Sequence, residues 1–491
     1  MNAPTPAAGP PSRSGVRRSG DHYQDLVTWG AALRVIQPRQ QFTGLEMEIN
    51  GVGNVDDIVL RHLTAGDHYS QVKWATNPAL LVDDTFLTQR KTKNSKSVLE
   101  KIFASYRKLR DPGRPPRLEL LTNRVLDPQD PLLGKVDGRT DLLVPHARLA
   151  APGTAAGSRV TAWAEHVGAS RDHILEMFDH LVFRTGLTVS SERDRAQTLM
   201  VAAGLRHDDE ALDAGITAVA GWIRDGAKSL SADELHHRVA ELGLHQDDPR
   251  AILLVQAIDR DLHPEDATEV LDWVDLYEGD SAMTRCQPKS SRHWRTMADE
   301  LREAVTRLRQ AGVRDVLVRG ALRQATFFAV GAELAQVTGR AVSYVQHGVL
   351  WSSASPRRPV PTPSVRRIEL GPGGDLAVAV GIAVDPSTAV ASHLAGSSTE
   401  VGELVVVLPR DGAHDQVVAG PGEAVAYAQE VRNIVRAELE RRPALRIHLF
   451  LAGPGGLALL LGHRWNRLAP TTVYEHLGPG RGYVPAFDVA A

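Results

Sequence analysis

The C-terminal part of the chain constrains the fold most, because short apolar runs alternate there with stretches of helical periodicity. From about residue 290 onward, the runs fall at 315–318, 341–346, 376–382, 404–408, 447–451 and 472–474. Strands that are apolar along their whole length are typical of parallel sheets covered by helices on both faces. A break rich in Pro, Arg and Ser at 352–367 separates two sets of runs. The pattern predicts an α/β unit at 290–491 with two Rossmann-like halves.

The middle of the chain, residues 159–280, carries apolar residues at helical spacing, with Ser170, Ser191 and Ser231 as plausible N-caps. We predict an all-helical connector there, preceded by a linker at 149–158 that is rich in Ala, Gly and Pro. Its many histidines lack a convincing metal-ligand spacing, so exposed helix positions explain them better.

Residues 21–148 follow a compact α/β order of helix, three strands, helix and strand. Helical periodicity at 23–33 precedes short runs of mixed polarity at 45–49, 56–60 and 69–74. A helix is predicted from about residue 95 to 109, and a buried strand at 117–123. Residues 1–20 lack an apolar segment and are rich in Pro, Ala, Ser and Arg, so we expect a disordered lead.

Acidic side chains and a lysine fall on neighbouring predicted strands of this unit. Alternation places Gln71 and Lys73 on one face of the third strand, and Glu46 and Glu48 on one face of the first. Asp57 belongs to the strand between them. An acid on one strand and a polar-x-Lys on the next can hold Mg²⁺ and orient a water against a phosphodiester. The layout therefore predicts a nuclease site.

In this site, Asp57 is the expected central ligand of Mg²⁺, the carbonyl of Val72 a second, and one of the two upstream glutamates an outer ligand. Lys73 would orient or deprotonate the attacking water and offset negative charge. Gln71 stands where many such nucleases carry an acid, and its amide oxygen can still ligate metal. A surface cross-strand pair without catalytic function explains the same residues, and that alternative stays open.

The predicted helix at 95–109 belongs to a basic run that can track phosphates or form a solvated face. Its members are Arg90, Lys91, Lys93, Lys96, Lys101, Arg107, Lys108 and Arg110, interrupted by Glu100 alone. Since the net charge of the chain is -3, any nucleic-acid contact must come from such a local patch.

Cysteine content and hydropathy exclude other classes of protein. Cys286 is the single cysteine, which rules out an internal disulfide framework and fits a reducing cytosol. No apolar run approaches the roughly 20 residues that a membrane span needs. We expect a cytoplasmic protein without a membrane partner.

In the C-terminal unit, the ends of the predicted strands are the expected ligand site, because open α/β sheets bind ligands beyond the carboxyl ends of their strands. No GxGxxG or Walker A sequence occurs. Arginines would contact phosphates, and aromatic rings would stack on nucleobases, although core packing explains the aromatics equally well. The candidate residues are Arg319, Arg323, Gln346, Trp351, Pro454 and Tyr474.

Taken together, these segments resemble a known combination of domains. Residues 20–24, Glu48, the acidic step at 56–57 and the triplet at 71–73 resemble a restriction-endonuclease-like nuclease of PD-(D/E)xK type, from the branch fused to SAVED domains. Residues 448–454, 461–463, 472–475 and 483–485 resemble part of a SAVED domain. Each motif is degenerate alone, whereas their order on one chain is more specific.

The resemblance implies an effector of the bacterial anti-phage systems called CBASS. A SAVED domain of two CARF-like halves would bind a cyclic di- or trinucleotide, protomers would self-associate, and the nuclease would degrade double-stranded DNA. Asp57, Gln71 and Lys73 match the nuclease motif, with Glu48 less directly aligned.

Two alternatives stay open. One is a restriction nuclease that needs no small ligand. The other is a non-catalytic cyclic-nucleotide sensor with a decayed nuclease fold. The neutral Gln71, at a position where many such nucleases carry an acid, supports this alternative.

Overall fold

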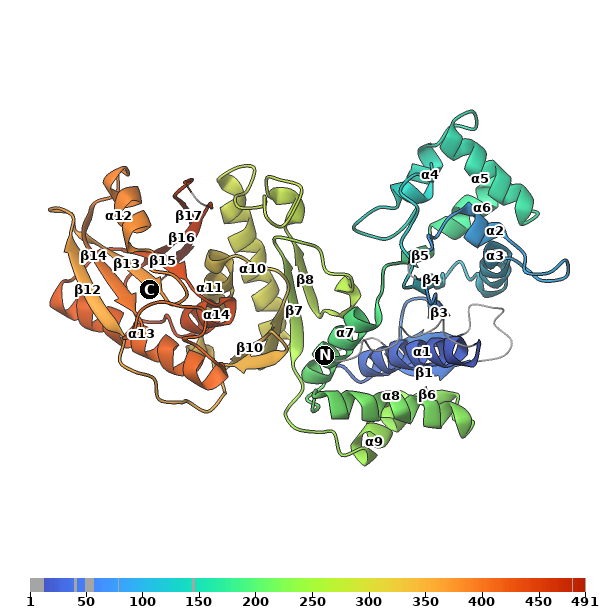
Figure 1. Ribbon diagram of the computed structural model, residues 1–491, viewed down its shortest axis with the longest axis horizontal. Helices are drawn as coiled ribbons and strands as arrows, with labels where there is room; N and C mark the ends of the chain where they lie inside the picture. Colours follow the sequence, from blue (N-terminus) through green and yellow to red (C-terminus); the bar gives the residue numbers. More distant parts are fainter. Residues whose placement is uncertain are drawn as a thin grey trace, which may run out of the picture. The chain divides into compact units, whose positions relative to one another are not determined.

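The computed structural model describes residues 13–38, 42–48, 57–77, 79–143, 146–478 and 480–490. The chain divides into two α/β units, residues 1–247 and residues 248–491 (Figure 1). Among the described residues, no helix combines the length and the apolar character that crossing a bilayer requires.

The N-terminal unit is built on a six-stranded mixed sheet of order β5-β4-β3-β2-β1-β6. Strands β3, β4 and β5 run parallel to one another, while β3, β2, β1 and β6 pair in antiparallel fashion. The strands are β1 (Phe42–Met47), β2 (Ile58–His62), β3 (His68–Lys73), β4 (Arg117–Thr122), β5 (Leu181–Arg184) and β6 (Ser229–Ser231).

Helices cover this sheet. Val59, Tyr69 and Leu120 of the sheet share one core with α3 (Val98–Leu109), α5 (Ala155–His166) and α6 (Arg171–Phe178). Helix α1 (Arg13–Val35) packs on β1 and β2 together with α7 (Val189–Ala202), α8 (Asp209–Arg224) and α9 (Ala232–Glu241). Shorter helices are α2 (Asp84–Thr88), α4 (His146–Leu149) and the 3₁₀ turn η1 (Leu133–Lys135).

Helix α3 is well specified by its own sequence. Ser97 accepts a hydrogen bond from the backbone N–H of Glu100, and the Glu100 carboxylate accepts one from the N–H of Ser97, which is a capping box. Leu99, Ile102 and Phe103 are buried, and the lysines and arginines of the helix face outward. The predicted basic helix is confirmed.

The C-terminal unit holds two sheets, as the apolar runs predict. The first has the order β11-β10-β9-β7-β8 and is parallel except for β11. Its strands are β7 (Ala251–Gln256), β8 (Glu269–Asp272), β9 (Asp315–Arg319), β10 (Ala341–Gln346) and β11 (Val349–Ser352). The second has the order β12-β14-β13-β15-β16-β17, with four parallel central strands between two antiparallel edges. Its strands are β12 (Ser364–Glu369), β13 (Asp375–Gly381), β14 (Val401–Leu408), β15 (Ile447–Ala452), β16 (Thr471–His476) and β17 (Tyr483–Val489).

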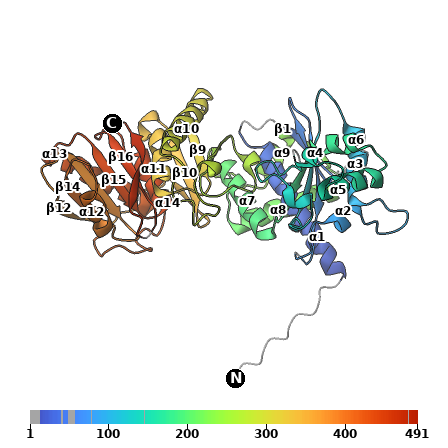
Figure 2. The ribbon, with the colours of Figure 1, turned by 90° about the horizontal axis from the view of Figure 1, so that it is seen from above.

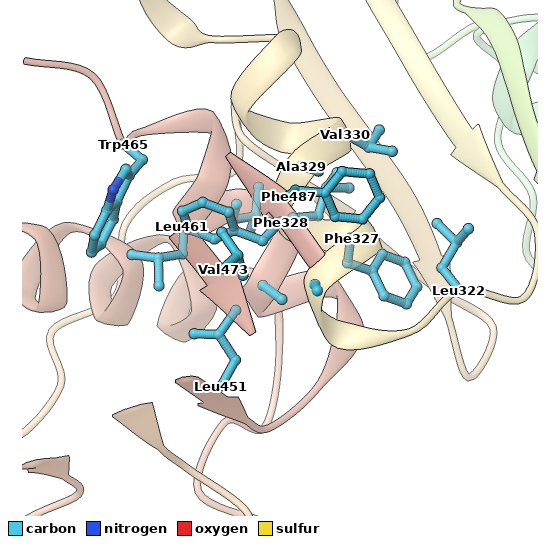
Figure 3. Close-up of a cluster of buried hydrophobic side chains, with 14 of the residues drawn as sticks. Leu322, Phe327, Phe328, Ala329, Val330, Leu451, Leu461, Trp465, Val473 and Phe487 are labelled. Carbon is cyan, nitrogen blue, oxygen red and sulfur yellow. The ribbon is translucent and has the colours of Figure 1, made fainter. Parts of the chain in front are cut away.

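Helices α11 (Gln324–Glu333) and α14 (Gly455–His463) lie between the two sheets (Figure 1 and Figure 2). Figure 3 shows the core around them, where Phe328 meets the edge of the Trp465 ring at 5.3 Å between centroids. The helices approach closely because Gly331 and Gly462 lack side chains. A Cβ at Gly331 would overlap the Leu459 carbonyl oxygen, and one at Gly462 that of Phe328.

The other helices of this unit are α10 (Arg292–Gln310), α12 (Ser387–Ala395) and α13 (Pro421–Arg441). Three 3₁₀ turns complete it: η2 (Pro264–Asp266), η3 (Val274–Leu276) and η4 (Gln336–Thr338). Helix α13 is buried along much of its length against α14 and β11.

The predicted all-helical connector at 159–280 is wrong. Strands β5 and β6 extend the N-terminal sheet, and β7 and β8 belong to the first C-terminal sheet. The division of the chain falls at 247/248, inside the predicted connector. The six buried residues of β7 form a short apolar run, and periodicity alone does not separate such a strand from a helix.

Two further predictions at the N-terminal end need correction. Residues 13–20, predicted as disordered, form the first turns of α1, while residues 1–12 lie outside the described part. The predicted linker at 149–158 is short, because Thr154 caps α5 at Ala155. Of the acidic step at 56–57, Asp56 lies outside the described residues.

Candidate functional site

The structure brings Asp57, Gln71, Val72 and Lys73 together at one end of β2 and β3. Asp57 Oδ2 accepts hydrogen bonds from the Gln71 amide and, at 2.7 Å, from the Val72 backbone N–H. Lys73 Nζ lies 4.0 Å from Asp57 Oδ2 and donates to the Val72 carbonyl oxygen at 3.2 Å. The antiparallel register of β2 and β3, in which Ile58 pairs with Ser70, places Asp57 beside Gln71.

An open cleft of about 570 Å³ starts at these residues. Gln71, Lys73 and Trp74 line one part, and the segments around α2 and α3 line the rest. Four further cationic side chains line this cleft, namely Lys91, Lys96, Lys101 and Arg124. Gln71 and Lys73 therefore share one cleft with part of the predicted basic run, although they are separated from it in the sequence.

The upstream glutamates do not both face this group. Glu46 lies on β1 opposite Val59, and its carboxylate pairs with the Arg61 guanidinium at 2.6 Å. Glu48 follows the end of β1 with a left-handed backbone (φ 45°), which interrupts the alternation assumed for this strand. Its carboxylate accepts a hydrogen bond from Gln24 at 3.3 Å and lies 3.9 Å from Lys228 Nζ. Sequence periodicity could not anticipate this turn.

Asp25 of α1 is a residue that the sequence analysis missed. Burial, together with the nearby charges of Asp21 and Glu48, raises the pKa of its carboxyl to about 6. The i, i+4 spacing of Asp21 and Asp25 on one helix was the signal that could have indicated it. Asp25 thus extends the acidic surroundings of Glu48 to α1.

The side chains of Asp57 and Gln71 and the Val72 carbonyl carry the oxygen atoms that a hard cation such as Mg²⁺ prefers. In this structure, the Gln71 NH₂ group and the Val72 N–H face Asp57 Oδ2, and the Val72 carbonyl oxygen accepts from Lys73, so the Gln71 amide would have to turn to ligate a metal. The geometry gathers Asp57, Gln71 and Val72 and leaves the Glu48 carboxylate with Gln24 and Lys228. Within the described ranges, no three His, Cys, Asp or Glu side chains form a metal-binding group.

In the C-terminal unit, the two candidate arginines are held by neighbouring loops. Arg319 forms a bidentate pair with the Asp261 carboxylate, with Nε and Oδ2 at 2.7 Å. Arg323 donates to the backbone carbonyl oxygens of Arg285 at 3.0 Å and Ala282 at 3.1 Å. Both side chains therefore order the loops that follow β7 and precede α10.

Three other candidates meet at the N-terminus of α14. The Gln346 side chain accepts a hydrogen bond from the Gly456 N–H at 2.9 Å, and Pro454 is the N-cap residue. The Trp351 ring lies against Gly456 and is only 4% exposed. These residues come from β10, β11 and the loop after β15, so the site joins the two sheets.

Tyr474 lies apart from that group. Its ring stacks on Phe450 at 4.4 Å in a separate core with α12, and its hydroxyl is 2.9 Å from His448 Nδ1. With 5% exposure, Tyr474 fills the core, as does Trp351. The alternative of core packing therefore describes both aromatic rings.

Comparison with known proteins identifies the C-terminal unit. Residues 297–489 match the family described as "SMODS-associated and fused to various effectors sensor domain", abbreviated SAVED. "CD-NTase-associated protein 4" of Enterobacter hormaechei subsp. hoffmannii (strain UCI 50) is 23% identical over 513 residues, which cover 96% of this chain and 98% of that protein.

Solved structures of Cap4 SAVED/CARF-domain containing receptors are also similar. The Acinetobacter baumannii receptor with the cyclic trinucleotide 2′3′3′-cAAA is 13% identical, with 96% of this chain and 99% of that chain covered and a TM-score of 0.46. The Moraxella osloensis receptor is 13% identical at the same coverage, with a TM-score of 0.43. Residues 297–489 are thus a SAVED domain, and the chain is homologous to CD-NTase-associated protein 4 over nearly its whole length.

Proposed function

We propose that this protein is an anti-phage CBASS effector, a metal-dependent endonuclease that cuts double-stranded DNA when a cyclic oligonucleotide occupies its SAVED domain. The observation that carries the nuclease part is the grouping of Asp57 with Gln71 and Lys73, two residues that line a basic cleft. The SAVED match and the homology to CD-NTase-associated protein 4 support the effector part.

In the proposed reaction, Lys73 provides the positive charge nearest to the scissile phosphate. Its ammonium group is oriented by the Val72 carbonyl oxygen and lies within 4.0 Å of Asp57, so it can orient a water and offset charge that develops on the phosphate. Asp57, Gln71 and the Val72 carbonyl would hold Mg²⁺, which polarises a phosphoryl oxygen and lowers the pKa of a bound water. The Glu48 carboxylate is proposed as an outer ligand that must first leave Gln24 and Lys228.

The substrate would lie along the cleft lined by Lys91, Lys96 and Lys101. None of these three side chains has an acidic partner in the described part of the chain, so their charges are available to phosphates. By contrast, Arg90 is paired with Glu100. An unpaired basic wall beside Lys73 fits a polyanionic substrate.

The ligand would bind where Gln346 and Pro454 meet at the N-terminus of α14, a place where backbone N–H groups attract phosphates. A cyclic trinucleotide is the ligand named for the Acinetobacter baumannii receptor, which makes this class the first to test. The ligand can activate cutting only by binding the competent, associated state more tightly than the resting state.

The central test is the Lys73→Ala variant, incubated with plasmid DNA, Mg²⁺ and a panel of cyclic di- and trinucleotides. Because the variant loses the charge beside Asp57, we expect cutting to fall by about 100-fold or more. Ligand affinity, measured by calorimetry, should stay unchanged because Lys73 and the SAVED domain belong to different units.

Lys135→Ala is the matched control, since Lys135 is an exposed lysine of the same unit outside the cleft. This variant should cut like the wild type. Full cleavage by Lys73→Ala would contradict the site assignment, and equal cleavage with and without every ligand would contradict the switch.

A further inference from the structure

Five arginines gather on the C-terminal unit around the middle of α13. This arginine cluster consists of Arg357, Arg432, Arg436, Arg464 and Arg467. Arg432 and Arg436 lie one turn apart on α13, and Arg464 and Arg467 belong to the loop after α14. The Arg432 guanidinium reaches that loop, where it donates to the Asn466 carbonyl oxygen at 2.9 Å.

Neutral groups, not carboxylates, contact the two central arginines. Arg464 Nη1 lies 3.2 Å from the side-chain oxygens of both Gln336 and Gln429. Glu430 pairs with Arg357 at the edge of the cluster. Within the described residues, the other four arginines have no carboxylate oxygen within 4.0 Å.

Several other arginines of this unit have carboxylate partners. Arg441 pairs with Glu403 and Glu438, and Arg319 pairs with Asp261. Arg432 and Arg464 have no such carboxylate partner within the described residues, and each has a buried Nε atom without a hydrogen-bond partner. A partly buried charge without a counterion is unfavourable, so this cluster lacks an anion that the other arginines have.

Repulsion between the guanidinium groups is a second indication that the cluster lacks an anion. Burial lowers the pKa of Arg432, and the charges of Arg436 and Arg467 lower it further. Burial likewise lowers the pKa of Arg464, with additional contributions from Arg357 and Arg432. Bringing a multivalent anion to this place would relieve the repulsion between neighbouring guanidinium groups.

We infer that the arginine cluster is a binding site for phosphate groups, centred on Arg432 and Arg464 and flanked by Arg436 and Arg467. Guanidinium groups donate paired hydrogen bonds that match phosphate oxygens, and a polyphosphate or a phosphodiester presents several such oxygens. The site is separate from the basic cleft of the N-terminal unit and shares no residue with the proposed ligand contacts at Gln346 and Pro454.

The test measures the unfolding temperature of the full-length protein against inorganic pyrophosphate, with sodium chloride adjusted to keep the ionic strength constant. We expect a saturable rise for the wild type, because an anion that binds only the folded protein stabilises it. The Arg432→Gln/Arg464→Gln double variant should need at least about ten times more pyrophosphate for the same rise. The Arg292→Gln/Arg295→Gln variant, with the same change in charge at exposed positions of α10, should respond like the wild type.

A second arm replaces pyrophosphate with a linear dinucleotide, which distinguishes a phosphodiester from a free phosphate anion. If the double variant does not unfold cooperatively, the exposed positions Arg436→Gln and Arg467→Gln replace it, each with an expected loss of about three-fold. The inference is overturned if the wild type shows no saturable response, or if the cluster variants respond like the control.

Discussion

The buried side chain of Glu475 connects a strand of the second sheet of the C-terminal unit to helix α11. It is 2% exposed on β16, and its carboxylate accepts hydrogen bonds from the N–H of Ala325 in α11 at 2.9 Å and from that of His476 at 3.1 Å. Burial raises the pKa of Glu475 to about 7, although the hydrogen bonds and Arg323 act in the opposite direction. One carboxylate of the second sheet thus caps the helix that follows β9 of the first.

This raised pKa predicts a pH dependence of stability. Glu475 releases its proton near pH 4.5 in the unfolded chain and near pH 7 in the folded chain. Its contribution to the free energy of unfolding is therefore complete below about pH 4.5 and is lost as the pH rises through 7. Glu475→Gln should remove this dependence and be more stable than the wild type at pH 8, by about 1–3 kcal/mol. Urea unfolding at pH 5 and pH 8 measures both values.

Glu440→Gln is the control for this experiment, because Glu440 is exposed on α13. It should leave the difference between pH 5 and pH 8 unchanged. A wild type whose stability varies no more than that of Glu475→Gln would show that the buried carboxyl does not titrate in this range.

At the scale of elements, the crossing of α11 and α14 depends on two glycines. Gly462→Ala would push a methyl group into the Phe328 carbonyl oxygen, and Gly331→Ala into that of Leu459. Overpacking of this kind costs about 1–3 kcal/mol, so each variant should unfold at a lower temperature. Gly374→Ala, at a position with open space, should unfold like the wild type in the same scan. A normal midpoint for both glycine variants would mean that the helices can separate without cost.

Helix α3 and the segment before it carry a prediction on DNA binding. In the Lys73→Ala background, in which the proposed cutting is expected to be lost, Lys96→Ala and Lys101→Ala should each reduce the salt dependence of binding to a short duplex. Each lost phosphate contact lowers the slope of log K against log salt by about 0.9. Fluorescence anisotropy at several salt concentrations measures the slope, with Lys135→Ala as control. If the slope of log K against log salt is unchanged in both variants, Lys96 and Lys101 do not contact DNA phosphates.

Among the elements, edge strands were the hardest to anticipate. Strand β12 has only exposed and half-buried positions and carries Arg366 and Arg367, so it has no apolar run to indicate a strand. Its pairing with β14 and the contact of Arg367 with Glu438 of α13 hold it in place. Such strands are defined by their neighbours rather than by their own sequence.

At the scale of the whole molecule, the two units divide the proposed chemistry between them. The candidate cleft lies within residues 1–247 and the candidate ligand contacts within residues 248–491. In the proposed function, a ligand would therefore act on the candidate cleft through a change of association or of conformation. We expect Lys73→Ala to form a larger species in sedimentation velocity when a cyclic di- or trinucleotide of the panel that binds the protein is present. An unchanged sedimentation coefficient at saturating ligand would contradict activation by self-association.

The sequence by itself determined the parallel α/β character of the C-terminal unit, the capped basic helix α3, and the identity of Asp57, Gln71 and Lys73 as neighbours on paired strands. These features depend on local periodicity, capping and strand alternation, which are encoded within short segments. Only the tertiary structure decided the assignment of β5 to β8 to two different sheets, the turn that directs Glu48 toward α1, and the arginine cluster. Those features depend on contacts between distant segments, which no local pattern contains.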